Sequence, residues 1–248
     1  MPETPTDDEI LRVRAGSDVV TAIEQFSIPG TQQAAASAKD GTGAEQPLGK
    51  PSTARTDERV SEAQIESAVA YLRNELSATT GFVAGLLLVG QSGELVLYSQ
   101  WTPQADAPVE VPAEWSLAPA VQGLDRIDSR TFGVDFTAPD DLSEASLKAT
   151  PHAHFGVFTV EPDKQEHLLE LAREHAPTSM GVPGLTTINF HRSLDGRRVI
   201  NLGLWSGFGE FENLLARPSF AQGDEYWIGV ATFRPRFFEV AAVVTASR

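Results

Sequence analysis

The sequence contains no cysteine among its 248 residues. Disulfide bonds, thiolate metal sites and cysteine nucleophiles are therefore excluded. It also lacks any run close to the ~18 apolar residues of a membrane-spanning helix. Its first residues, MPETPTDDE, are acidic and polar, whereas a secretory signal begins basic and continues apolar. From these absences we expect a cytoplasmic protein.

Basic residues are scarce, with 19 Lys and Arg against 34 Asp and Glu, and the net charge is -15. Such a surface repels phosphate backbones and anionic lipids, so we expect neither a nucleic-acid nor a membrane partner. With 41% hydrophobic and 21% charged residues, the composition is that of a soluble globular protein. The length suits one large or two small domains.

Motifs for bound cofactors are missing as well. The glycines of residues 41–49 have no strand-to-helix setting and do not form a nucleotide loop. His152 and His154 could form a metal pair, but no third ligand stands at a suggestive spacing. We therefore expect no metal and no tightly bound cofactor.

The most informative stretch is a hairpin near the C-terminus. Two runs rich in Thr, Ile, Val and Leu, 185–192 and 198–205, flank Asp195-Gly196, a strong turn signal. Because side chains alternate along a strand, the second run places four residues on one face: Val199, Asn201, Gly203 and Trp205. An amide and an indole separated by a glycine form a plausible wall for a flat ligand.

The length of this turn decides where His191 lies. A two-residue loop would pair Phe190 with Asn201 and send His191 to the other face. A three-residue loop with a glycine bulge would pair His191 with Asn201. We predict the bulge, because a related hairpin earlier in the chain is one residue shorter.

That earlier hairpin, 81–101 around Gln91-Ser92-Gly93, belongs to an internal repeat. Both copies read as strand, helix, hairpin ending in Trp, connector and strand, which is the ferredoxin-like βαββαβ plan of an α+β protein. We expect the two antiparallel sheets to pack face to face. The predicted organisation is a disordered tail over 1–15, a first repeat over 16–140 with a mobile loop at 29–60, and a second repeat over 141–248.

The predicted elements of the first copy are a strand at 18–28, a helix from Ser61 and a strand at 130–137, with 102–127 as irregular cover. Those of the second copy are a strand at 154–160, helices at 162–175 and 207–216, and a strand at 237–244. Each rests on apolar periodicity and on Gly or Pro punctuation.

The second copy resembles the antibiotic biosynthesis monooxygenase family, and within it the anthrone monooxygenases of aromatic polyketide pathways. The matching residues lie at fixed spacing in HRSLDGRRVINLGLW: His191, Ser193, Asp195, Gly196, Val199, Asn201 and Trp205, preceded by Pro183-Gly184. The resemblance implies a dimeric α/β barrel, formed here within one chain as a pseudo-dimer that could associate further into a homodimer.

The resemblance also implies oxidation of an anthrone-type aromatic polyketide to a quinone, with O2 as co-substrate and no metal or flavin. Asn201 would hydrogen-bond the oxyanion or peroxide, Trp205 would pack on the rings and offer its indole N–H, and His191 would accept a proton. The remaining pocket residues would be Gly203, Val199, Phe208, Phe211 and His154. Phe211 stands where the family has a tyrosine, and Arg217, Arg234 and Arg236 are the arginines that could replace another missing family residue.

In the first copy, the equivalent of Asn201 is Leu97 or Tyr98, depending on the alignment, and that of His191 is Leu87 or Leu88. We therefore expect a catalytically degenerate first copy. Two other functions fit the same features. One is an aromatic polyketide cyclase of the same fold that does not use O2, and the other is a non-catalytic ligand-binding protein.

Overall fold

The structure is a computed structural model that describes residues 9–29, 59–102, 107–207 and 226–246. Eight strands in these residues close into a barrel in the order β10-β3-β4-β2-β5-β8-β9-β7, and all neighbours are antiparallel. The barrel strands are β2 (Val20–Ser27), β3 (Phe82–Gly90), β4 (Glu94–Trp101), β5 (Asp125–Ala138), β7 (His152–Val160), β8 (Leu185–Ser193), β9 (Arg198–Trp205) and β10 (Ala231–Thr245).

The barrel consists of two equivalent halves, as the internal repeat predicted. The first half has the strand order β3-β4-β2-β5 and the second has β8-β9-β7-β10, which is the same ferredoxin-like order. The last strand of each half pairs with the other half, β5 with β8 and β10 with β3. This exchange closes the sheet into a barrel. The predicted intrachain dimeric α/β barrel is thus confirmed.

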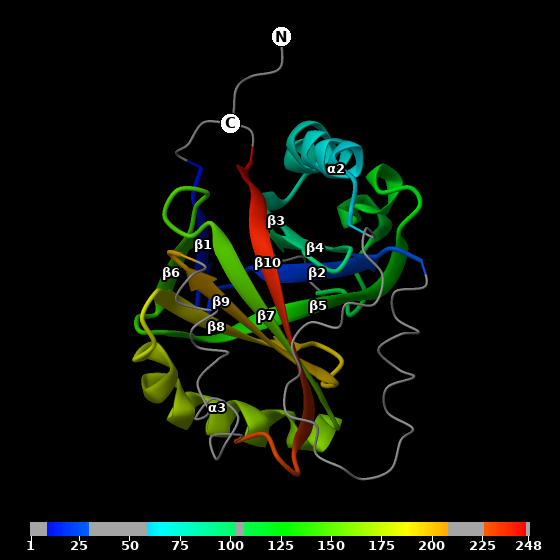
Figure 1. The fold of residues 1–248 in the computed structure, drawn as a ribbon. Coiled ribbons are helices and arrows are strands. Elements are labelled where there is room, and N and C mark those ends of the chain that lie inside the picture. The colour runs from blue at the N-terminus through cyan, green and yellow to red at the C-terminus, as the bar shows by residue number, and fades with distance from the viewer. Residues whose placement is uncertain (1–8, 30–58, 103–106, 208–225, 247–248) are drawn as a thin grey trace, which may run out of the picture.

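In the described part of the chain, one helix packs on the outside of each half. Helix α2 (Glu62–Asn74) begins at Ser61, which forms a capping box with Gln64. Helix α3 (Gln165–Met180) follows a 3-10 turn at Pro162–Lys164. The two helices lie on opposite outer sides of the barrel (Figure 1). Each buries an apolar cluster against its own half-sheet, so the helices stabilise the outer faces while the two sheets cover each other inside.

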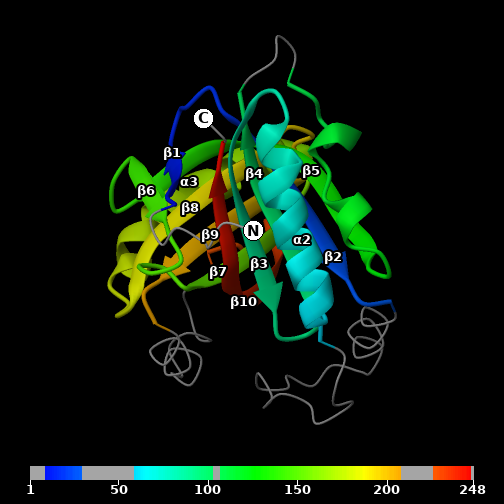
Figure 2. The same cartoon turned by 90° about the horizontal axis from the view of Figure 1, so that it is seen from above.

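A small two-stranded sheet, β1 (Leu11–Arg14) and β6 (Leu142–Ala145), lies at one flank of the barrel (Figure 2). The sequence placed residues 1–15 in a disordered tail, and for Leu11–Arg14 this is wrong. Leu11 and Val13 are completely buried and join the apolar core of the barrel interior. Their burial compensates for the entropy of ordering the segment. The predicted mobile loop lies almost entirely outside the described residues.

The connector between β4 and β5 covers the first half, as predicted for 102–127. It contains 3-10 turns at Ala113–Trp115 and Ala118–Ala120. The Trp115 ring stacks on that of Trp101, with centroids 4.5 Å apart. Beneath it, the buried carboxylate of Glu24 accepts hydrogen bonds from Ser116 Oγ (2.8 Å) and the Leu117 backbone N–H (2.7 Å). This side of the first half is filled by its own chain.

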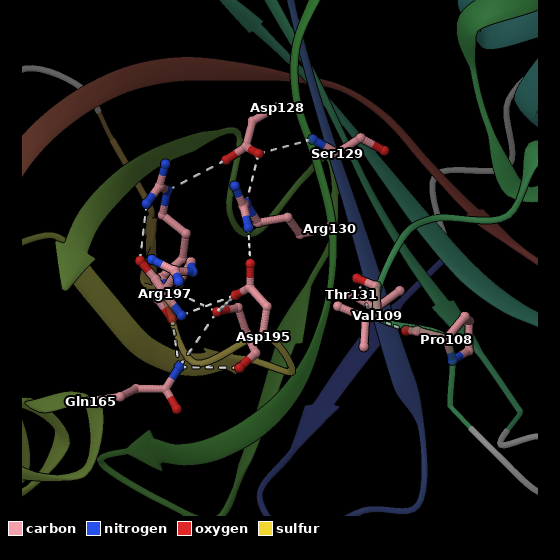
Figure 3. Close-up of polar contacts among 11 residues, drawn as sticks. Pro108, Val109, Asp128, Ser129, Arg130, Thr131, Gln165, Asp195 and Arg197 are labelled. Atoms are coloured by element: carbon pink, nitrogen blue, oxygen red, sulfur yellow. Dashed lines mark hydrogen bonds and ion pairs between the residues drawn. The ribbon is translucent and has the colours of Figure 1, made fainter. Parts of the chain in front are cut away.

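The turn between β8 and β9 is fixed by polar contacts (Figure 3). The Asp195 carboxylate accepts hydrogen bonds from Ser193 Oγ (2.6 Å) and the Arg197 backbone N–H (2.9 Å), and it pairs with Arg130 of β5. The Gln165 amide at the start of α3 donates to the backbone carbonyl of Ser193 at 3.1 Å. The turn therefore ties β9, α3 and the first half together.

The predicted glycine bulge in this turn is wrong. Arg192 pairs with Val199 across six residues (193–198), whereas Val89 pairs with Leu95 in the first half across five (90–94). The additional residue lies in the turn itself, where the hydrogen bonds accepted by the Asp195 carboxylate fix a longer loop. The bulge of each hairpin lies at the opposite end, between Leu185 and Thr187 and between Phe82 and Ala84.

Candidate active site

The outer face of β9 carries the four residues that the sequence placed together. Val199 belongs to the apolar cluster beneath α3, which fixes this face as the outer one. The intervening residues Ile200, Leu202 and Leu204 belong to the core inside the barrel. Asn201, Gly203 and Trp205 therefore share the outer face with Val199. The alternation predicted from the sequence is confirmed.

Asn201 is the unusual member of this row. It lies opposite Phe190 of β8 on one side and Gly156 of β7 on the other. Its Oδ1 atom is buried and makes no hydrogen bond in the part of the chain that the structure describes. A buried polar atom without a partner costs about 1–3 kcal/mol. Such an atom on an otherwise apolar surface is expected where a ligand completes the hydrogen bonding.

The strands on both sides of Asn201 carry aromatic rings. Phe190 stacks on Phe136 with centroids 4.7 Å apart, and Phe158 stacks on Phe233 at 4.5 Å. The Phe233 ring lies directly over Gly156, where an added Cβ would approach Cε2 to 2.8 Å. The absence of a side chain at Gly156 thus allows an aromatic ring to approach the sheet next to Asn201. The surroundings suit a flat aromatic ligand.

Trp205 and His154 form a second polar feature on the same face. The Trp205 indole Nε1–H donates to His154 Nδ1 at 2.9 Å. His154 lies opposite Gly203 in the sheet, and its ring occupies the space above that glycine, where an added Cβ would fall within the ring. Gly203 was predicted as a place of close approach to substrate. The group that approaches it is His154.

His154 is neutral in this arrangement. Burial lowers the pKa of His154 to about 4. A neutral imidazole has one N–H, and because Nδ1 accepts from Trp205, that hydrogen is on Nε2. The indole N–H of Trp205, which the resemblance assigned to the pocket, is donated to His154.

His191 does not belong to this site, contrary to prediction. Phe190, not His191, pairs with Asn201, and His191 pairs with Ile200 on the inner face. It is completely buried inside the barrel, where Nε2 lies 3.0 Å from Tyr98 Oη and Nδ1 lies 3.1 Å from the Asn189 carbonyl oxygen. The wider turn keeps the strand register in which His191 lies on the inner face of the barrel. We therefore remove His191 from the mechanism.

The other predicted pocket residues fall into two groups. Val199 lies on the correct face but is completely buried beneath α3. Phe208, Phe211 and the predicted helix 207–216, apart from Gly207, lie outside the described residues. Of the arginines, Arg236 forms an ion pair with Glu94 of β4, so its charge is compensated within the barrel wall.

No group of three potential metal ligands occurs among the described residues. Likewise, none of the described helices combines the length and the apolar character needed to cross a membrane.

Comparison with known proteins identifies the family. Over 88 residues the chain is 31% identical to tetracenomycin-F1 monooxygenase of Streptomyces glaucescens, covering 34% of this chain and 76% of that protein. The chain belongs to the antibiotic biosynthesis monooxygenase family. This membership supports monooxygenase activity as its reaction class. A scan against models of protein families finds no match.

Solved structures support the fold of this family member over almost its whole length. An anthrone oxidase-like protein matches 96% of this chain and 98% of its own, with a TM-score of 0.66 and 15% identity. A proposed monooxygenase from Fusobacterium nucleatum matches 93% of this chain and 95% of its own, with a TM-score of 0.56 and 8% identity. At these identities the likeness concerns the fold alone.

The two halves of this family member differ at the site. We align the two hairpins by their strand register, with Trp101 matched to Trp205. Leu97 is then the counterpart of Asn201, and Leu88 is the counterpart of His191. Ser99 stands in place of Gly203 and Ala22 in place of His154. The register thus decides between the equivalents that the sequence left open.

Sequence reasoning missed two contributors to the site, Gly156 and Phe233. A glycine inside the strand 152–160 is a signal of close approach and could have been noticed. The position of Phe233 could not, because β10 begins six residues earlier than the predicted strand at 237–244. Pro235 lies in the stretch of β10 that pairs with β7 on one side only, the kind of position in a sheet that tolerates proline.

Proposed function

We propose that this protein is a cofactor-independent monooxygenase that oxidises an anthrone-type aromatic polyketide to a quinone with O2. The observation that carries the proposal is the buried amide oxygen of Asn201, which has no hydrogen-bond partner among the described residues and lies within an aromatic wall, two residues along β9 from the Gly203–His154 pair. Similarity to tetracenomycin-F1 monooxygenase supports an aromatic polyketide as the substrate class.

The proposed chemistry needs no external reductant. An anthrone is a carbon acid, and loss of one methylene proton gives an enolate rich enough in electrons to react with O2. A C–O bond forms to give a peroxide, and the second methylene proton and the O–O bond are then lost. The methylene carbon becomes a carbonyl, and the other oxygen atom leaves as water. The protein must bind the rings, stabilise the enolate and exclude bulk water.

The described residues fit these tasks in part. Phe190 and Phe233 supply aromatic surface, and Asn201 supplies an amide oxygen that accepts no hydrogen bond from the described residues and can accept one from a substrate hydroxyl. We place one site in each chain, on the second half. In the first half, a leucine stands at the position of Asn201, and Trp115 stacks over the corresponding outer face.

The test is aerobic and anaerobic turnover of 1,8-dihydroxy-9-anthrone by metal-free protein. We expect O2 uptake equal to quinone formed, and a loss of about 100-fold in kcat for Asn201→Ala. Trp205→Phe should also lose activity. Trp101→Phe is the matched control, because the same change at the equivalent position of the first half should alter stability and leave kcat unchanged.

Other outcomes would contradict the proposal. Bound anthrone with no O2 uptake, together with a cyclised product from a linear polyketide under nitrogen, would identify an aromatic polyketide cyclase. Binding with no product under either condition would identify a ligand-binding protein. Equal losses in Trp101→Phe and Trp205→Phe would remove the assignment of the site to the second half.

A further inference from the structure

The first half of the barrel satisfies the indole N–H of its own tryptophan without a histidine. Accepting that hydrogen bond therefore does not explain why the second half has His154 beside Trp205. In the first half, Trp101 Nε1–H donates to Ser99 Oγ at 2.9 Å. Ser99 occupies the position of Gly203, and Ala22 that of His154. The same fold therefore satisfies the same indole with a serine on its own strand.

The second half replaces this simple pair with a larger group. A glycine stands where the serine would be, and the ring of His154, from the neighbouring strand, fills the space and accepts the indole N–H. Structurally, the two solutions are equivalent, since each satisfies one indole donor. They differ because the imidazole of His154 has a second nitrogen that can form another hydrogen bond, whereas Ser99 has a single hydroxyl, which already accepts from Trp101.

The second nitrogen, Nε2, is the free end of this arrangement. Nδ1 and Cε1 are accounted for, because Nδ1 accepts from Trp205 and Cε1 lies against Gly203. Nε2 makes no hydrogen bond to any of the described residues, and His154 remains partly exposed. With Nδ1 engaged as an acceptor, Nε2 carries the hydrogen and can only donate.

We infer that His154 is a neutral hydrogen-bond donor to the oxyanion of the bound substrate, and that Trp205 and Gly203 position it by fixing its tautomer and its ring. The inference rests on the proposed function, since the oxyanion is that of the anthrone enolate. His154 is thereby a catalytic residue beside Asn201, and Trp205 is a positioning residue that acts through it. Its lowered pKa of about 4 keeps the ring uncharged above about pH 5.

A neutral donor suits this reaction better than a cationic one. A donor aimed at the position where charge develops stabilises the enolate and leaves it anionic, whereas a full proton transfer would convert it into a neutral enol that reacts less readily with O2. The assignment excludes His154 as the general base, because its only basic nitrogen is occupied by the indole N–H.

The first measurement needs no substrate. Long-range 1H–15N NMR of histidine-labelled protein should show His154 as the Nε2–H tautomer from pH 8 to pH 5, and His154→Gln identifies its signals. Trp205→Phe removes the donor to Nδ1 and should give a mixture of tautomers. An Nδ1–H tautomer in the wild type, or an unchanged tautomer in Trp205→Phe, would overturn the inference whatever the protein's activity.

The second measurement follows enolate formation without O2. Under nitrogen, absorbance titration of bound 1,8-dihydroxy-9-anthrone should show an ionisation constant at least about tenfold higher than that of free anthrone. His154→Phe should lose this increase and about 100-fold in kcat, whereas His154→Gln, which retains an N–H donor, should stay within about tenfold of the wild type.

The matched control restores the arrangement of the first half. The double variant His154→Ala/Gly203→Ser offers a serine to the indole and should fold with the Trp205 N–H still hydrogen-bonded, yet it should lose the enolate stabilisation. If this variant kept the wild-type anthrone ionisation, His154 would be only a packing partner of Trp205. If the wild type bound no anthrone at all, the proposed function would fail and the oxyanion role with it, whereas the NMR result would still decide the tautomer.

Discussion

Protonation of His191 should make the fold sensitive to mild acid. His191 is completely buried beside Tyr98, and burial lowers its pKa from 6.5 to about 4. Burial also raises the pKa of Tyr98 to about 12, so both groups are neutral in the folded protein. The unfolded chain binds a proton at this histidine below about pH 6.5, whereas the folded protein does so only below about pH 4. The free energy of unfolding therefore falls as the pH drops from about 6.5 to about 4.

The magnitude follows from the shift. One pKa unit corresponds to 1.36 kcal/mol, so lowering the pKa from 6.5 to about 4 is worth about 3 kcal/mol when protonation is complete. Between pH 7.5 and pH 5.0 about 2 kcal/mol of this should be lost. Both values lie above the sequence pI of about 4.7, so the net charge keeps its sign.

The assay is urea unfolding at the two pH values for the wild type and for His191→Gln. Glutamine retains an acceptor for the Tyr98 hydroxyl and does not titrate, so the variant should lose about 2 kcal/mol less than the wild type between pH 7.5 and pH 5.0. His167→Gln, on α3 with a side chain 59% exposed, is the control and should behave as the wild type. A difference below about 0.5 kcal/mol between wild type and His191→Gln would refute the reasoning.

Two further substitutions test the two halves separately. Glu24→Gln leaves one acceptor oxygen where the carboxylate accepts from Ser116 Oγ, the Leu117 N–H, Arg126 and Ser129 Oγ, so urea unfolding should show a loss of about 1–3 kcal/mol with kcat unchanged; an unaltered midpoint would contradict this. Gly156→Ala places a methyl group 2.8 Å from the Phe233 ring, so kcat for the anthrone should fall roughly tenfold, and an unchanged kcat would exclude Phe233 from the pocket wall.

Local signals in the sequence determined the elements and their order. Gly93 and Gly196, with φ of 75° each, occupy the turns that the sequence assigned to them, and the Ser61 cap begins a helix as predicted. Alternation placed Val199, Asn201, Gly203 and Trp205 on one face. These features depend on residues within a few positions of each other, so the sequence alone specifies them. The repeat of this order then predicted the barrel.

Only the tertiary structure decided which residues meet at the site. The face of His191 depends on the parity of the strand register, and the Asp195 contacts with Arg130 and the turn hold that register across the two halves. His154 meets Trp205 because β7 lies beside β9, although their residues are 51 positions apart in the chain. Pairing between distant strands results from packing of the whole sheet, and short-range patterns carry no information about it.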